Sequence, residues 1–115
     1  MNDMVKIRDR FLKDDIPTRL GSLASNLRRI NSFSSLDINQ EVVKGLLEES
    51  KYFIEWTAAE TEINTAGELV ELQILLARVT FNLNRIWCEK NRRKKLAEQA
   101  LQWSDRVLEL SGLLS

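Results

Sequence analysis

The residues that could carry acid–base chemistry in this sequence are five glutamates between positions 48 and 62. They are Glu48, Glu49, Glu55, Glu60 and Glu62. Two carboxylates can act as general acid and general base when their surroundings separate their pKa values. However, Glu48 follows Lys44 by four residues and precedes Lys51 by three, and these spacings make side chains neighbours on a helix. We therefore expect a solvated, ion-paired helix face and no catalytic residue among these glutamates.

Histidine is absent and cysteine occurs once, at position 88. The chain therefore lacks the commonest general base and cannot assemble the familiar structural zinc sites. It also lacks a glycine-rich phosphate loop and a dinucleotide-binding fingerprint. We expect Cys88 to be a half-buried small residue at a helix end rather than a reactive thiol. The sequence predicts a protein that is not an enzyme and that binds no metal and no cofactor.

A basic run near residue 90 is the feature that could bind phosphates. Its residues are Arg85, Lys90, Arg92, Arg93, Lys94 and Lys95. Residues 77–95 carry seven basic and one acidic side chain, a net +6, whereas residues 37–76 carry two basic and nine acidic ones, a net −7. Such a cluster can neutralise nucleic-acid phosphates. However, the whole chain has no net charge and no nucleic-acid recognition motif. We favour a charged junction between helices and keep nucleic-acid binding as the alternative.

Apolar residues recur at alternating spacings of three and four through most of the chain, as in helices packed at a shallow angle. One such row comprises Leu69, Leu72, Leu76, Val79, Leu83 and Ile86. Only four glycines and one proline interrupt the 115 residues, and no segment sustains the alternation of a strand. The pattern predicts an all-α, antiparallel up-and-down helical bundle in a single domain over residues 1–115. We expect a short leading helix at 4–13 and four bundle helices at 16–31, 38–60, 66–90 and 93–114.

Local signals mark several of the expected helix ends. Pro17, with two aspartates before it, suits the start of a helix. Asp37 followed by Gln40 resembles a capping box, in which two residues satisfy each other's backbone N–H groups. Thr65 followed by Glu68 resembles a second such box. We therefore expect helix starts close to residues 16, 38 and 66.

The connection near residue 90 has two interpretations. Neither glycine nor proline lies between Leu69 and Leu110, and one heptad row runs in phase through Arg93. A continuous helix of about 50 residues would be about 75 Å long and would need a second chain to cover it. The alternative is a tight turn at Asn91, because asparagine tolerates the left-handed conformation that ends helices. We favour the turn and leave open that the last two helices are fused.

A second set of apolar residues lies outside the main rows. It comprises Tyr52, Trp56, Val70, Ile74 and Phe81. A helix with so wide an apolar surface is either central in its own fold or covered by another chain. We favour the central position and keep these residues as candidates for a partner surface, either in a homodimer or as a docking surface for a partner helix. A homodimer is the favoured partner arrangement.

The sequence as a whole favours a non-enzymatic helical protein–protein interaction module that self-associates. A nucleic-acid-binding accessory protein that uses residues 85–95 is the alternative. No window approaches 18 uncharged apolar residues, and the first 15 residues lack the apolar stretch of a signal peptide. We therefore expect a cytoplasmic protein with no membrane partner.

Overall fold

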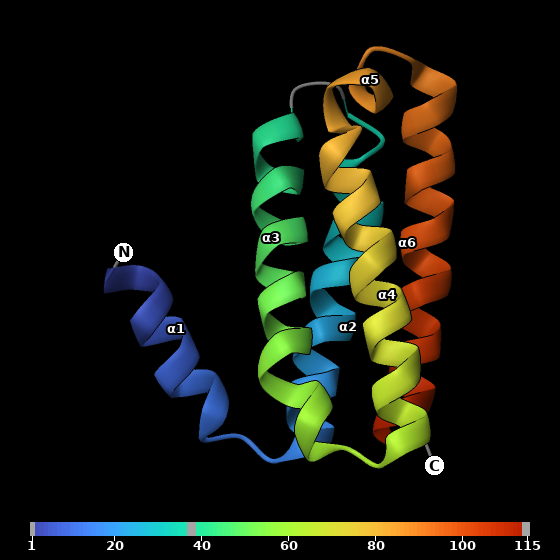
Figure 1. The fold of residues 1–115 in the computed structure, drawn as a ribbon. Coiled ribbons are helices and arrows are strands. Elements are labelled where there is room, and N and C mark those ends of the chain that lie inside the picture. Colours follow the sequence, from blue (N-terminus) through green and yellow to red (C-terminus); the bar gives the residue numbers. More distant parts are fainter. Residues whose placement is uncertain (1, 37–38, 114–115) are drawn as a thin grey trace.

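The computed structural model describes residues 2–36 and 39–113, and every regular element in these ranges is helical. The α-helices are α1 (Asn2–Leu12), α2 (Ile16–Phe33), α3 (Gln40–Thr57), α4 (Ile63–Phe81), α5 (Leu83–Trp87) and α6 (Lys90–Ser111). A short 3-10 helix, η2 (Ala58–Glu60), follows α3. Figure 1 shows the four longest helices running side by side, each in the direction opposite to the one before it. The predicted all-α fold class is confirmed.

The start of α2 agrees with the sequence signal. Asp15 is its N-cap, and the Asp15 carboxylate accepts a hydrogen bond from the backbone N–H of Thr18 at 2.9 Å. Pro17 lies in the first turn of the helix, where no intrahelical N–H is needed. The Thr18 hydrogen bond also holds the pKa of Asp15 below its ordinary value. The helix extends to Phe33, two residues beyond the expected end.

The closest helix packing joins α2 to α6. Small residues line this contact, including Ala24 on α2 and Ala100 and Ser104 on α6, and all three are buried. Small side chains let two helix backbones approach, so that polar groups can bond across the seam. The Ser104 hydroxyl donates to the carbonyl of Ala24 at 2.8 Å, and Asn31 Nδ2 donates to the carbonyl of another small residue, Ala97, at 2.7 Å.

One row of α3 residues at spacings of three and four is buried throughout. It comprises Val43, Leu47, Ser50, Ile54 and Thr57, each at most 1% exposed. The leading helix α1 leans away from α3 (Figure 1), and Phe11 is its main contact with α3. The ring of Phe11 stacks on Phe53 with centroids 4.2 Å apart and also contacts Trp56. Phe11 is buried and Ile7 is partly buried against the core, so these two side chains attach α1.

Two expected helix boundaries were wrong at the connection between α3 and α4. The helix predicted at 38–60 is α3, which ends at Thr57 and is followed by η2. The start predicted at Thr65 lies three residues earlier, because Glu62 is the N-cap of α4 and accepts from the Thr65 N–H at 3.1 Å. Glu68 therefore has no capping role and is free to bond elsewhere. The capping box predicted from Asp37 falls on a residue outside the described ranges.

The expected helix at 66–90 is interrupted. It ends at Phe81, where Asn82 Nδ2 donates to the carbonyl of Arg78 at 3.0 Å, and the chain then turns into α5. Leu83 and Trp87 on α5 are buried, so the turn moves these two side chains into the core. The interruption is explained by this tertiary packing, which the uninterrupted heptad phase of the sequence did not predict.

The connection predicted at Asn91 lies two to three residues earlier, and the alternative of one continuous helix was wrong. Cys88 and Glu89 separate α5 from α6, and Glu89 is extended with φ −124° and ψ 121°. This break lets α6 fold back against α2. The heptad phase continues through Arg93 because both helices bury faces of the same period, so it could not distinguish the two interpretations.

Candidate interaction surfaces

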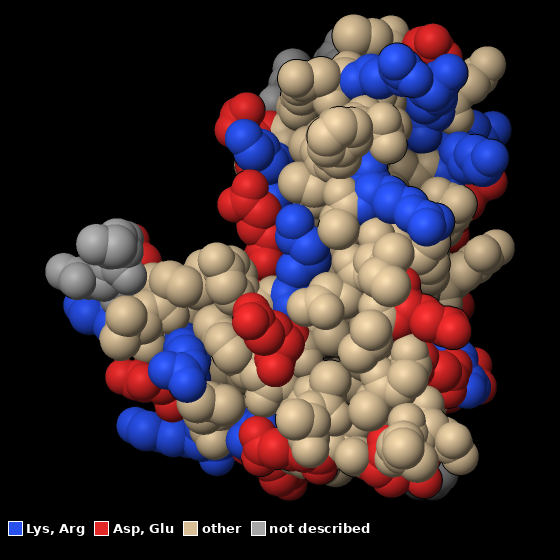
Figure 2. Space-filling model, in the orientation of Figure 1, with Lys and Arg blue, Asp and Glu red and all other residues tan. Residues whose placement is uncertain are grey.

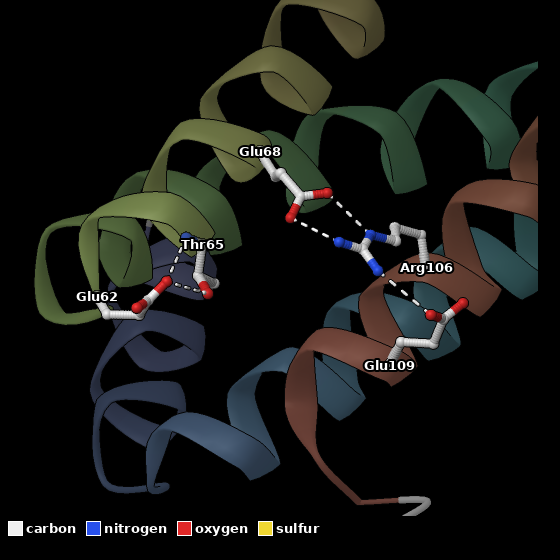
Figure 3. Close-up of polar contacts among 5 residues, drawn as sticks. All are labelled: Glu62, Thr65, Glu68, Arg106 and Glu109. Carbon is white, nitrogen blue, oxygen red and sulfur yellow. Dashed lines mark hydrogen bonds and ion pairs between the residues drawn. The ribbon is translucent and has the colours of Figure 1, made fainter.

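The helix α4 is held firmly on its inner side. Leu69, Leu72 and Leu76 are buried in the core. On its flank, Glu68 accepts two hydrogen bonds from Arg106 of α6, one from Nε and one from Nη2, each at 2.8 Å (Figure 3). Arg106 Nη1 also donates to Glu109 at 3.2 Å. These two parallel hydrogen bonds link the flanks of α4 and α6 in a bidentate ion pair.

This ion pair shifts the titration of both partners. The hydrogen bonds from Arg106 hold the pKa of the Glu68 carboxyl below its ordinary value. The same contact raises the pKa of Arg106, with Glu109 adding to the effect. Both side chains are about half exposed, so water and salt screen the pair. The pair therefore adds a screened link between α4 and α6, whereas burial of Leu69, Leu72 and Leu76 decides which face of α4 points away from the core.

The opposite face of α4 is apolar and uncovered. Its residues recur at spacings of four, three, four, three and four, and we call them the α4 outer face: Ile63, Gly67, Val70, Ile74, Ala77 and Phe81. Ile63 and Phe81 are 84% and 90% exposed, and Val70 and Ile74 are 44% and 49% exposed. Figure 2 shows a largely uncharged surface over α4. Monomeric proteins rarely expose contiguous apolar patches of this kind without a binding role.

Three of the five residues predicted as a partner surface belong to the α4 outer face, namely Val70, Ile74 and Phe81. The other two lie on α3. Tyr52 is 41% exposed and lines a shallow groove with Gln73 of α4. Trp56 is partly buried, stacks on Tyr52 with ring centroids 5.5 Å apart, and also contacts the ring of Phe11. The five predicted residues therefore lie on two neighbouring helices that meet at this groove, and their role in partner binding stays a prediction.

Sequence reasoning missed Ile63, Gly67 and Ala77. The signal was present, because all three continue the heptad spacing of Val70, Ile74 and Phe81. Gly67 and Ala77 have small side chains that add little to an apolar pattern, and the helix start expected at residue 66 leaves Ile63 outside the helix. Moving that start from residue 66 to residue 63 adds Ile63 to the row.

The basic run lies where α5 meets α6, and we call residues 85–95 the basic corner. Blue side chains gather at this end of the molecule in Figure 2. Arg85, Lys90, Lys94 and Lys95 are exposed. Arg92 is also exposed, and its Nε donates to Glu89 at 2.7 Å. Most of the predicted phosphate contacts are therefore accessible to solvent.

Arg93 is the exception within the basic corner. It is half-buried, its Nη1 donates to the carbonyl of Trp87 at 2.6 Å, and its guanidinium lies 6.0 Å from the Trp87 ring centroid. The contact satisfies a carbonyl at the end of α5, where no intrahelical partner exists. Arg93 thus stabilises the turn between α5 and α6, and its guanidinium group is already engaged in contacts within the fold.

Of the five glutamates considered for chemistry, Glu48 and Glu55 line one shallow groove with Lys51, and the other three bond elsewhere. Glu49 accepts from Asn26 at 3.0 Å, Glu60 pairs with Arg19 at 2.8 Å, and Glu62 caps α4. Cys88 is exposed rather than half-buried, because it lies in the turn after α5. Among residues 2–36 and 39–113, no group of three or more potential ligands could hold a metal ion.

Comparison with known proteins gives no relative. No protein-family model matches the chain, and no curated protein and no solved structure matches it. Within the described part of the chain, none of the helices has the length and apolar character needed to cross a membrane. The α4 outer face and the basic corner are therefore the features of the molecule that indicate a function.

Proposed function

We propose that this chain is a non-enzymatic helical protein–protein interaction module that self-associates in the cytoplasm. In this proposal α2, α3, α4 and α6 act as an antiparallel up-and-down four-helix bundle, and residues 1–115 form one domain. The bundle presents the α4 outer face to a partner. A homodimer is the arrangement that we favour.

The single observation that carries this proposal is the exposure of the α4 outer face. The helix has two apolar faces, of which the core covers only the one with Leu69, Leu72 and Leu76. A soluble helix that is apolar on both sides is normally covered on both sides. Phe81, at 90% exposure, exposes a large apolar ring that a partner would remove from water.

Sedimentation or light scattering across a concentration series tests the proposal. We expect the chain to shift from monomer to dimer as its concentration rises. Ile74→Lys places a charge in the middle of the α4 outer face and should give a monomer. Val5→Lys is the matched control, because Val5 is 59% exposed on α1 and should tolerate the same change without loss of the dimer.

Circular dichroism must show that both variants keep the helical content of the parent. A parent that stays monomeric at every concentration would contradict self-association. So would equal dimerisation of the parent and Ile74→Lys, because that result would place the contact on another surface.

A second candidate function is nucleic-acid binding through the basic corner. The observation that favours it is the exposure of Arg85 on α5 and of Lys90, Lys94 and Lys95 in the first two turns of α6. Titration with DNA and RNA at low and physiological salt tests it. Lys94→Ala combined with Lys95→Ala should weaken binding and reduce its salt dependence, and unchanged binding would exclude these residues as contacts. Arg93 is unsuitable for this test because it supports the fold.

A further inference from the structure

Small and large side chains of the α4 outer face are arranged on both sides of Ile74, which is at its centre. Gly67 lies seven residues before Ile74 and Phe81 lies seven residues after it. Val70 lies four residues before and Ala77 three residues after. A second copy of α4 running in the opposite direction through the same centre would set Phe81 against Gly67, and Val70 against Ala77. Each larger side chain then faces a smaller one.

We propose that the α4 outer face is covered by the α4 outer face of a second copy of this chain, antiparallel, with Ile74 on the twofold axis. This inference rests on the proposed self-association and adds the orientation and register of the pair. A twofold axis perpendicular to a helix makes the two copies of that helix antiparallel, as closed symmetric dimers require.

Within one chain, the notch at Gly67 is empty. A Cβ atom added at Gly67 would meet nothing within 4 Å, and Gly67 is exposed. Phe81, two heptads away, projects into solvent at 90% exposure. Fourteen residues of α-helix span about 21 Å, so the two positions cannot meet within one helix. The antiparallel pair places the Phe81 ring of each copy in the Gly67 notch of the other copy.

The backbone of Gly67 gives no other reason for glycine. The residue lies inside α4 with a helical conformation, and positive φ among the described residues occurs only at Gly112. Glycine in a helix interior lowers helix stability relative to alanine. A close approach by a second helix accounts for a residue without a side chain at this position.

Charges beside the row support the same register. Glu71 and Arg78 lie on the same side of the α4 outer face, and both are exposed. Neither side chain belongs to an ion pair among the described residues. The antiparallel pair brings Glu71 of each copy opposite Arg78 of the other. A parallel pair would instead put the two copies of Glu71 on opposite sides of the contact, and likewise the two copies of Arg78, so these opposite charges would not face each other.

Complementary charge reversal tests the orientation directly. In the Glu71→Arg homodimer, and equally in the Arg78→Glu homodimer, like charges would meet at both ends of the contact. We expect each variant alone to dimerise at least about tenfold more weakly than the parent. A mixture of the two restores opposite charges at both places, so a heterodimer should form with a Kd within about threefold of the parent value.

A steric test examines the notch. Gly67→Leu fills it and should abolish dimerisation while keeping the fold, because leucine favours helix and its Cβ would meet nothing within 4 Å. Gly45→Leu is the matched control. Gly45 is also an exposed helical glycine with nothing within 4 Å of an added Cβ, but it lies on α3. Gly45→Leu should dimerise like the parent.

The outcomes separate this inference from the proposal beneath it. A parent chain that is monomeric at every concentration overturns both. A parent that dimerises, whose charge-reversed variants fail to restore each other in a mixture, overturns the antiparallel register and leaves self-association standing. Dimerisation of Gly67→Leu at parental strength also overturns the register, since the notch would then be unoccupied.

Discussion

Leu76 and Phe81 are large apolar residues of the same helix, yet truncating each to alanine should affect the stability of the monomer very differently. Leu76 is 0% exposed, and Phe81 is 90% exposed. In a dilute monomer, Leu76→Ala should lower the free energy of unfolding by about 2 to 5 kcal/mol, because it removes buried contacts and leaves a cavity.

For Phe81→Ala the magnitude follows from the small buried fraction. Full burial of a phenylalanine side chain contributes about 1.5 to 3 kcal/mol, so burial of a tenth contributes about 0.3 kcal/mol at most. Alanine also favours helix slightly more than phenylalanine. We therefore expect the free energy of unfolding of the monomer to change by less than about 0.5 kcal/mol.

Urea unfolding followed by circular dichroism measures both effects, at a protein concentration where the parent is monomeric. At higher concentration the parent should gain stability from dimerisation, and Phe81→Ala should not. A loss of more than about 1 kcal/mol in dilute Phe81→Ala would refute the reasoning, because it would mean that the ring packs within its own chain.

Three further predictions concern the interior and the helix contacts. Arg19 is 7% exposed and donates to Glu60 and to two backbone carbonyls, so Arg19→Leu should lower the free energy of unfolding by about 1 to 3 kcal/mol in a urea titration. The buried Thr57 hydroxyl has no hydrogen-bond partner among the described residues, so Thr57→Val should raise the melting temperature, with a gain of about 1 kcal/mol. The pKa of Glu68 is lower in the folded protein than in the unfolded chain, so the unfolded state gains the proton first as pH falls. Stability from this ion pair should be complete above about pH 5 and decline below it, and Glu68→Gln should remove that part of the pH dependence.

Several features of the fold could be predicted from residue order because they are local. The spacing of apolar residues predicted the helices, and Pro17 marked the start of α2 correctly. The break between α3 and α4 was also expected, although the cap is Glu62 and not Thr65. A carboxylate at Glu62 and a hydroxyl at Thr65 are both capping signals, so the residue types alone did not decide which of them begins the helix.

The candidate site was only partly predictable, for a different reason. Val70, Ile74 and Phe81 were recognised as a second apolar row, but Trp56 was grouped with them although it packs with Phe11 from α1. Which apolar residues share a surface depends on the rotation of each helix about its axis. That rotation is a property of the neighbouring helices and not of the spacing within one helix.

The amino-acid sequence by itself determined that this chain forms amphipathic helices, because hydrophobic period, proline placement and scarcity of glycine all act over a few residues. Only the tertiary structure decided where the long apolar run after residue 69 would break, and which of the two apolar faces of α4 the core would cover. Burial depends on what the rest of the chain can reach. The inner row of α4 meets the other helices, and its outer row is left for a partner.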